Sequence, residues 1–160
     1  MPGRKNYSRA QNDIFEKKKL TSMQLTSKDL FKLGIFPFLV YTFNSICQSL
    51  ADDFYINYSV DTLSHFLGGL SIAYSANYAL SLMEKRGWIV IHKNILRAGI
   101  IMGAVMTFAV LWEFYEFIYD LLLWGTTMQP SIADTIKDFT MAMIGVVVFS
   151  VGMLYKMKKK

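Results

Sequence analysis

The chain contains a single cysteine, Cys47, and this is the first of several scarcities that narrow its class. One cysteine excludes an internal disulfide, a zinc site built from several cysteines and a redox-active thiol pair. The first residues are polar and basic, so we expect no secretory signal peptide, which needs an early apolar core. The sequence also has no Gly-rich phosphate loop and no nucleophile motif. Ser64 merely adjoins His65, and adjacent helical residues point to different faces.

Charged residues are nearly absent from several stretches of about 18 residues or more, which is the sequence signal of membrane-spanning helices. Hydrophobic residues make up 53% of the chain, a high fraction for a soluble protein. We therefore predict an all-α integral membrane protein, a four-helix transmembrane bundle, in preference to a soluble helical bundle. The expected spans are residues 30–50, 60–83, 95–124 and 134–155.

The polar flanks divide the chain into three parts. Residues 1–28 form a basic arm, residues 29–156 form the transmembrane domain, and residues 157–160 form a basic tail. Within the first span, Ser27 is the expected helix N-cap and Pro37 is expected to kink the helix.

Lysine and arginine are missing from the first and third connections between the spans. They are frequent in the arm, in the second connection and in the tail. The positive-inside rule then places both termini in the cytoplasm, with the chain integral to the plasma (inner) membrane. The same basic residues set topology and contact anionic membrane lipids, so the net charge of +5 does not indicate nucleic-acid binding.

Three carboxylates interrupt the outer half of the third expected span, in the segment "LWEFYEFIYDLLLW". Glu113, Glu116 and Asp120 follow one another at spacings of three and four, which puts them on one helical face. At a rise of about 1.5 Å per residue, Glu113 lies roughly 16 Å below Trp124, near the middle of the membrane, and Asp120 lies about 6 Å below it.

Further ionisable residues are expected at the same depth on the neighbouring spans. Asp61 and His65 share a face near the outer end of the second span, and Asp134 and Asp138 do so on the fourth. Lys137 is the one cation expected beside them. Ionised carboxylates are costly in hydrocarbon, so a cluster of this kind must be protonated, hydrated, paired or metal-bound, and it is a candidate functional site.

The leading hypothesis is a metal-dependent or acid–base site that opens to the outer leaflet and acts on a lipid or lipid-linked envelope molecule, as a hydrolase or transferase would. One histidine and many oxygens favour magnesium, calcium, manganese or iron over a structural zinc, although a catalytic zinc with mixed ligands also fits. We expect catalysis by Glu113, Glu116 and His65, and binding of a divalent metal ion by these three with Asp138. Asp61, Asp134 and Asp120 would orient the ligands, and Lys137 would contact an anionic headgroup.

Two other functions stay open. Glu113 and Glu116 could relay protons or bind a cation in a small transporter or channel, although the second to fourth spans contain no obvious helix break. Alternatively the chain could be a non-catalytic partner subunit or a homo-oligomer. Small residues at four-residue spacing allow close helix packing, within the chain or between chains, at three pairs: Gly69 and Ala73, Ser71 and Ser75, and Gly99 and Gly103.

Three motifs, in this order, resemble those of the YjdF-like inner-membrane proteins. "DTLSHFLGG" is similar to their Asp-x-x-x-His-Phe segment, "WEFYEF" to their Glu-x-x-Glu helix, and "DTIKDFTMAMIG" to their Asp-x-x-Lys-Asp segment with its following glycine. VanZ-like proteins share a looser version of the pattern. The resemblance covers Asp61 to Gly145 and implies an envelope-associated membrane protein with a polar site. Ala142 departs from it, because relatives often carry Asp or Asn there, which removes one polar group from the expected site.

Overall fold

The computed structural model of the protein describes residues 25–50, 60–122 and 131–159. Residues 1–24 of the basic arm, the first connection, the last two residues of the third expected span, most of the third connection and the last residue of the tail therefore lie outside the described residues. Everything described is helical apart from short connecting and terminal segments. The expected all-α class is confirmed, and the expected span boundaries agree with the observed helices to within three residues.

Four long helices make up the described fold: α2 (Ser27–Leu50), α4 (Val60–Lys85), α5 (Asn94–Leu122) and α6 (Ile132–Lys158). By length and composition, α2, α5 and α6 are able to cross a membrane. The helix α4 is long enough but is interrupted by more polar side chains, and it falls outside this group.

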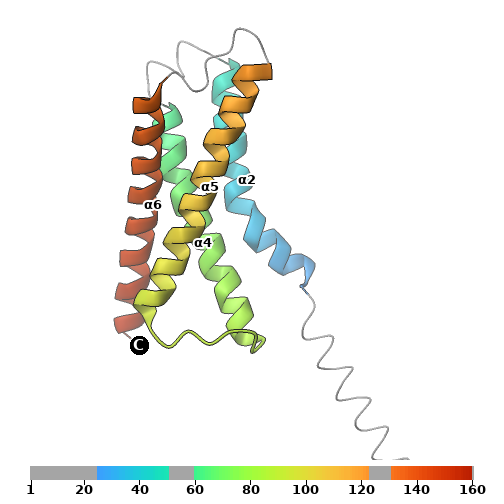
Figure 1. Ribbon diagram of the computed structural model, residues 1–160. Helices are drawn as coiled ribbons and strands as arrows, with labels where there is room; N and C mark the ends of the chain where they lie inside the picture. Colours follow the sequence, from blue (N-terminus) through green and yellow to red (C-terminus); the bar gives the residue numbers. More distant parts are fainter. Residues whose placement is uncertain (1–24, 51–59, 123–130, 160) are drawn as a thin grey trace, which may run out of the picture.

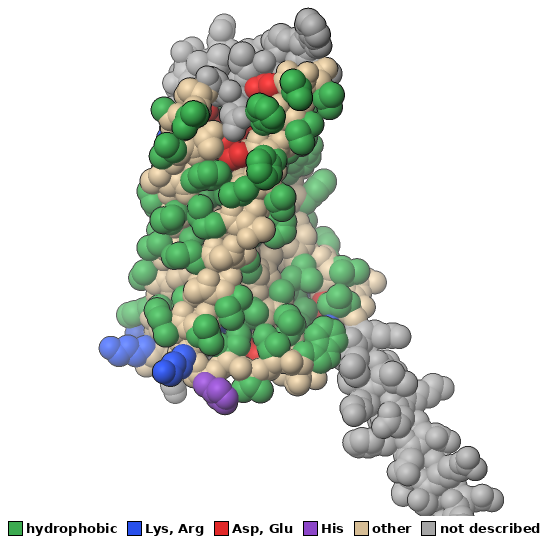
Figure 2. Space-filling model, in the orientation of Figure 1, with side chains coloured by type: hydrophobic (Ala, Val, Ile, Leu, Met, Phe, Trp, Pro, Cys, Tyr) green, Lys and Arg blue, Asp and Glu red, His purple; other side chains and the backbone are tan. Residues whose placement is uncertain are grey.

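The helices alternate in direction along one bundle, so that α2 and α5 point one way and α4 and α6 point the other way (Figure 1). The start of α2, the connection between α4 and α5, and the end of α6 lie at one end of the bundle. Figure 2 shows Lys, Arg and His side chains at that end, the larger Asp and Glu patches near the opposite end, and hydrophobic side chains over the surface between them. This distribution matches the charge asymmetry of the sequence.

The central element is α4, which packs against each of the other three helices. Much of its surface is therefore covered by protein, and fewer of its side chains need to be apolar. Along α2 the two helices are joined by Tyr78 Oη donating to Asp29 Oδ1 at 2.9 Å, and by Ser75 Oγ donating to the Leu33 carbonyl at 2.6 Å. Figure 1 shows α2 changing direction along its length, as expected from Pro37.

The helices α4 and α6 approach each other closely at two glycines. A Cβ placed on Gly69 would meet the Ala142 carbonyl oxygen, and one on Gly145 would meet the Phe66 carbonyl oxygen, in each case closer than real contacts allow. Gly69 therefore packs within the chain, as the spacing of small residues allowed. Gly99 and Gly103 differ, since a Cβ on either would meet nothing within 4 Å.

One face of α5 is buried at a regular four-residue spacing. The stripe begins with Arg97, continues through the apolar Ile101, Val105 and Ala109, and ends with Glu113. Four residues are slightly more than one helical turn, so these side chains lie one above another on the side that faces the bundle. The stripe is thus apolar in its middle and ionisable at both ends.

Local hydrogen bonds define where the helices begin and end. The N-cap of α2 is Thr26 and not the expected Ser27: the Thr26 hydroxyl accepts from the Asp29 backbone amide at 3.2 Å, and the Asp29 carboxylate accepts from the Thr26 amide at 3.1 Å. This reciprocal pair satisfies two helix-terminal donors at once, which Ser27 could not do. Ser131 caps α6, and Gly87, with φ of 72°, ends α4.

Candidate functional site

The ionisable residues of α4, α5 and α6 meet near the end of the bundle where α4 and α6 begin. The Nε2 atom of His65 lies 3.4 Å from Asp61 Oδ1 on its own helix and 3.8 Å from Glu113 Oε1 on α5. Asp138 approaches the same histidine from α6. The convergence expected from membrane depth is therefore present in the fold.

Three overlapping groups of ligand-type side chains are formed, and within each group the donor atoms lie within 4.8 Å of one another. Two of the groups contain His65 and two contain Asp138, so the groups form one continuous cluster. We call the six residues of the three groups the acidic cluster. They are Asp61, His65, Glu113, Glu116, Asp134 and Asp138.

The centre of the acidic cluster is closed to solvent. His65, Glu113, Glu116 and Asp138 are between 2% and 7% exposed. Among the described residues, Nε2 of His65 and Oδ1 of Asp138 are buried and make no hydrogen bond. Buried polar atoms are normally satisfied, so these two atoms point to a group that would complete the site.

Two further residues contact the acidic cluster. Trp112 Nε1 donates to Glu116 Oε1 at 2.8 Å, which fixes that carboxylate one turn along α5. Lys137 Nζ lies 2.5 Å from Asp134 Oδ1 and 3.8 Å from Asp138 Oδ1, while its side chain is 42% exposed. Lys137 thus sits at the edge of the acidic cluster, between buried carboxylates and the surroundings.

The structure separates the expected site residues into two sets. The six residues of the acidic cluster and Lys137 come together, whereas Asp120 is half-buried and belongs to none of the three groups. Ala142 is buried one turn beyond Asp138, and its backbone is in contact with Gly69. Ala142, where the resemblance leads us to expect a polar residue, therefore lies in the close contact between α4 and α6.

A second polar cluster joins α4 to α5 at the other end of the bundle, and sequence reasoning did not find it. Arg97 is buried, donates to Asn77 Oδ1 at 2.8 Å and to the Asn77 carbonyl at 3.0 Å, and pairs with Glu84 and Ser81. The spacing of Asn77, Ser81 and Glu84 on one face of α4 was a usable signal. Because all three guanidinium nitrogens donate hydrogen bonds to these partners, we interpret the cluster as structural.

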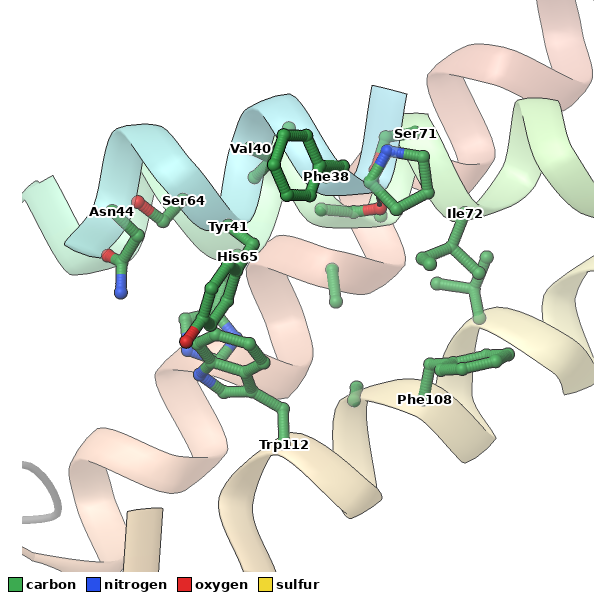
Figure 3. A pocket seen from close by; sticks show the side chains of 16 residues that line it. Phe38, Val40, Tyr41, Asn44, Ser64, His65, Ser71, Ile72, Phe108 and Trp112 are labelled. Atoms are coloured by element: carbon green, nitrogen blue, oxygen red, sulfur yellow. Dashed lines mark hydrogen bonds between the residues drawn. The ribbon is translucent and has the colours of Figure 1, made fainter. Parts of the chain in front are cut away.

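An apolar groove of about 370 Å³ lies beside the acidic cluster, between α2 and α5 and over α4. Val40 and Tyr41 line it from α2, Phe108 lines it from α5, and Ser64 and His65 form part of its floor. Figure 3 shows Tyr41, His65 and Trp112 gathered at one part of the groove, with Phe108 and Ile72 further along it. The groove therefore connects an apolar surface to the histidine of the acidic cluster.

Comparison with known protein families gives one match. The family model described as "Predicted membrane protein (DUF2238)" matches residues 26–160, which include all four helices and the acidic cluster. Comparison with curated proteins and with solved structures gave no match. The match supports the membrane-protein resemblance noted in the sequence, while the looser likeness to VanZ-like proteins finds no support in it.

Proposed function

We propose that this chain, which belongs to the DUF2238 family of predicted membrane proteins, carries a divalent metal ion in the acidic cluster and acts through it on a lipid or lipid-linked envelope molecule. We also propose that the YjdF-like proteins, which the three sequence motifs resemble, belong to this same family. The observation that carries the proposal is the burial of ionisable side chains from three helices around two polar atoms that make no hydrogen bond among the described residues, His65 Nε2 and Asp138 Oδ1.

Charge balance favours a cation at this position. Asp61, Glu113, Glu116, Asp134 and Asp138 surround His65, and Lys137 is the cation paired with two of them. Several carboxylates in a closed space repel one another unless they are protonated or share a positive charge. A divalent ion supplies that charge and also accepts the lone pair of a neutral imidazole nitrogen.

The donor set indicates the kind of metal. One imidazole and several carboxylate oxygens suit magnesium, manganese, calcium or iron, and a catalytic zinc with mixed ligands also fits. We assign His65, Glu113, Glu116 and Asp138 as the ligands, with Asp61 and Asp134 holding them in orientation. Lys137, exposed at the edge, would contact an anionic headgroup.

Such an ion would lower the pKa of a bound water and so favour hydrolysis or group transfer at an ester or phosphate. In hydrolysis, a carboxylate of the acidic cluster, Glu113 or Glu116, would take a proton from the attacking water. The departing alcohol oxygen would then receive a proton from the same group, so that the site returns to its starting state.

We further propose that all four helices cross the plasma (inner) membrane, with both termini in the cytoplasm. The helix α4 would cross as the enclosed helix of the bundle, surrounded by the other three. Lys156 and Lys158 in the last turn of α6, and the basic arm preceding α2, support this orientation through the positive-inside rule. The acidic cluster would then open toward the outer leaflet.

The test is the metal content of the detergent-purified protein, measured by elemental mass spectrometry. We expect a near-stoichiometric divalent metal in the unchanged chain, its loss in a Glu113→Gln, Glu116→Gln double variant, and its retention in Asp29→Asn. Asp29 is a matched control, because it is a carboxylate bonded to Tyr78 and Arg86 at the opposite end of the bundle. No bound metal after supplementation with divalent ions would refute the metal proposal and leave protonated carboxylates in proton relay or a structural role.

A phenotype completes the test of the residue assignments. If the Glu113→Gln and His65→Ala variants fold normally and cells that carry them show no change in phenotype, the assigned roles are wrong.

A partner-subunit role is the second candidate, and it is favoured by Gly99 and Gly103. Both are exposed on α5, and the space beside each is open. A second helix could approach closely there. Stoichiometric co-purification of one partner that is lost in Gly103→Leu, together with tolerance of the Glu113→Gln change, would favour this role over catalysis. The transporter alternative receives less support, because α4, α5 and α6 are each continuous.

A further inference from the structure

We infer that the groove between α2 and α5 holds one hydrocarbon chain of a lipid, with the polar end of that lipid at His65. This inference rests on the proposed function, because it names the part of the substrate that lies outside the acidic cluster. It begins from a gap between backbones: α4 contacts both α2 and α5, whereas among the described residues no Cα atom of α2 lies within 8 Å of one of α5.

The lining of the groove suits hydrocarbon. Val40 and Phe38 of α2 face Val105 and Phe108 of α5 across it, and Ile72 lies on the floor. Nearly all of the surface that lines the groove is apolar. A volume of about 370 Å³ is within the range of small-molecule sites, roughly 300–1,000 Å³.

The polar atoms of the groove lie on the α4 turn next to the acidic cluster. Ser64 and His65 both line the groove and are both 7% exposed. Ser64 Oγ and His65 Nε2 are buried and make no hydrogen bond among the described residues. A lipid headgroup or ester oxygen placed there would meet the Ser64 hydroxyl beside the acidic cluster, while its chain continued along Gly68 and Ile72.

Two aromatic rings mark the boundary between groove and acidic cluster. Tyr41 of α2 and Trp112 of α5 meet edge to face, with ring centroids 5.9 Å apart (Figure 3). They make the contact that α2 and α5 otherwise lack on this side. The Trp112 indole in turn donates to Glu116, so the group that borders the chain also positions a carboxylate of the acidic cluster.

A lipid chain fits the groove better than the other possible occupants. Both walls are helices apolar enough to cross a membrane, so the groove would open sideways into the bilayer. The basic arm before α2 would bring lysines into an apolar site, which is costly. A second copy of the chain would need to insert a helix, and a groove of this volume accommodates a single chain of methylenes more readily.

The test uses a long-chain fatty acid that carries a photoactivatable diazirine near its methyl end. The full chain is reconstituted in lipid nanodiscs, irradiated, digested and analysed by mass spectrometry. We expect cross-links concentrated on residues 37–44 of α2 and 105–112 of α5. Cross-links spread evenly over the lipid-facing surfaces of α5 and α6 would overturn the inference.

Two pairs of variants make the test specific. Gly68→Leu should reduce the groove cross-links severalfold by filling the floor, because a Cβ on Gly68 meets nothing within 4 Å and folding should be preserved. Gly152→Leu, also open but on the far half of α6, is its control. Phe108→Ala should likewise weaken labelling, with Phe31→Ala of α2, another exposed phenylalanine that does not line the groove, as control. Unchanged labelling in both Gly68→Leu and Phe108→Ala would overturn the inference.

Metal content measured on the same samples separates this inference from the proposed function. Gly68→Leu should keep its metal and lose the cross-link. Groove labelling in a protein that binds no metal would refute the metal proposal and still support the chain site. A change from dimer to monomer in Gly68→Leu, without a change in labelling, would assign the groove to a second copy and overturn the inference.

Discussion

Trp112 links the two parts of the candidate site through one side chain. Its ring packs against Tyr41 and Tyr115, with centroid distances of 5.9 Å and 5.5 Å, and its Nε1 donates to Glu116 at 2.8 Å. A hydrogen bond to a carboxylate inside a protein is stronger than one in water. When the donor is removed, the buried carboxylate oxygen has no partner, and the free energy lost in its desolvation is not recovered. Trp112 therefore contributes to both stability and carboxylate position.

Replacing Trp112 by Phe removes the donor and keeps an aromatic ring. We expect Trp112→Phe to lower the free energy of unfolding in detergent by about 1–2 kcal/mol. In a Glu116→Met background the same change should cost much less, because the acceptor is already gone. Trp88→Phe, at an exposed tryptophan outside the acidic cluster, is the control. Equal effects of Trp112→Phe in the two backgrounds would mean that the hydrogen bond contributes little.

For single residues, the sequence predicted which ionisable side chains come together better than it predicted their hydrogen-bond partners. Depth and spacing alone indicated that His65, Glu113 and Asp138 come together, because helices of similar length that cross one layer must align their ends. The Trp112 bond and the Arg97 cluster were not predicted, since each depends on how two helices are rotated about their axes. That rotation follows from packing, which hydropathy does not contain.

Among the elements, the contact between α4 and α6 is the most constrained by shape. Two adjacent glycines of α4 have opposite surroundings: a Cβ on Gly69 would overlap the backbone of Ala142, whereas a Cβ on Gly68 would meet nothing within 4 Å. Backbone atoms cannot move aside as a flexible side chain can. The helices would have to separate to admit even one methyl group.

Gly69→Ala should therefore destabilise the protein by on the order of 1–3 kcal/mol, the cost of overpacking a close contact. Gly68→Ala should be neutral or stabilising by up to about 1 kcal/mol, since alanine favours a helix over glycine. Thermal or denaturant unfolding of the two purified variants, side by side, measures the difference. Equal stabilities would show that α4 and α6 are not in close contact at Gly69.

Element boundaries were largely predictable, and the exceptions have local causes. Apolar runs end where charged or turn-forming residues begin, which is why all four predicted spans are close to the observed helices. The cap of α2 was misplaced by one residue, because both Ser27 and Thr26 are common N-cap types and serine is the more favoured of the two. The position of Asp29, three residues after Thr26, decides between them.

For the whole molecule, the arrangement of the four helices predicts which helix ends lie on the same side of the membrane. If α4 crosses the membrane with the other three, the connection between α4 and α5 lies on the same side as the end of α6 (Figure 1). The end of α5 and the start of α6 lie on the other side. The single cysteine makes this simple to test, since Cys47→Ala leaves a background without thiols.

In that background we expect a membrane-impermeant maleimide to label Thr127→Cys in intact cells or spheroplasts. His92→Cys and Lys159→Cys should be labelled only after the membrane is permeabilised, because the positive-inside rule places both in the cytoplasm. Labelling of His92→Cys from outside, with Lys159→Cys still protected, would show that α4 does not cross. The opposite pattern at all three positions would show that the orientation is reversed.

For the whole molecule, the sequence did not predict which helices pack against one another. Hydropathy predicted four spans without stating that α4 is enclosed or that α2 and α5 are separated by a groove. Enclosure explains why α4 tolerates Ser71, Asn77 and other polar residues, which is also why it is the least apolar of the four. The groove arises from the packing of α2 and α5 on either side of α4, and no single helix encodes it.

The buried stripe on α5 should tolerate the substitution of its residues better than the insertion or deletion of a residue. Arg97 and Glu113 are ionisable ends of one buried face, and each has its partners on α4. Exchanging one apolar residue for another between them leaves both ends in place. Inserting or deleting a single residue would turn one end by about 100° relative to the other and present a charge to lipid. Natural variation in this segment should therefore consist of substitutions, with insertions and deletions confined to the connections.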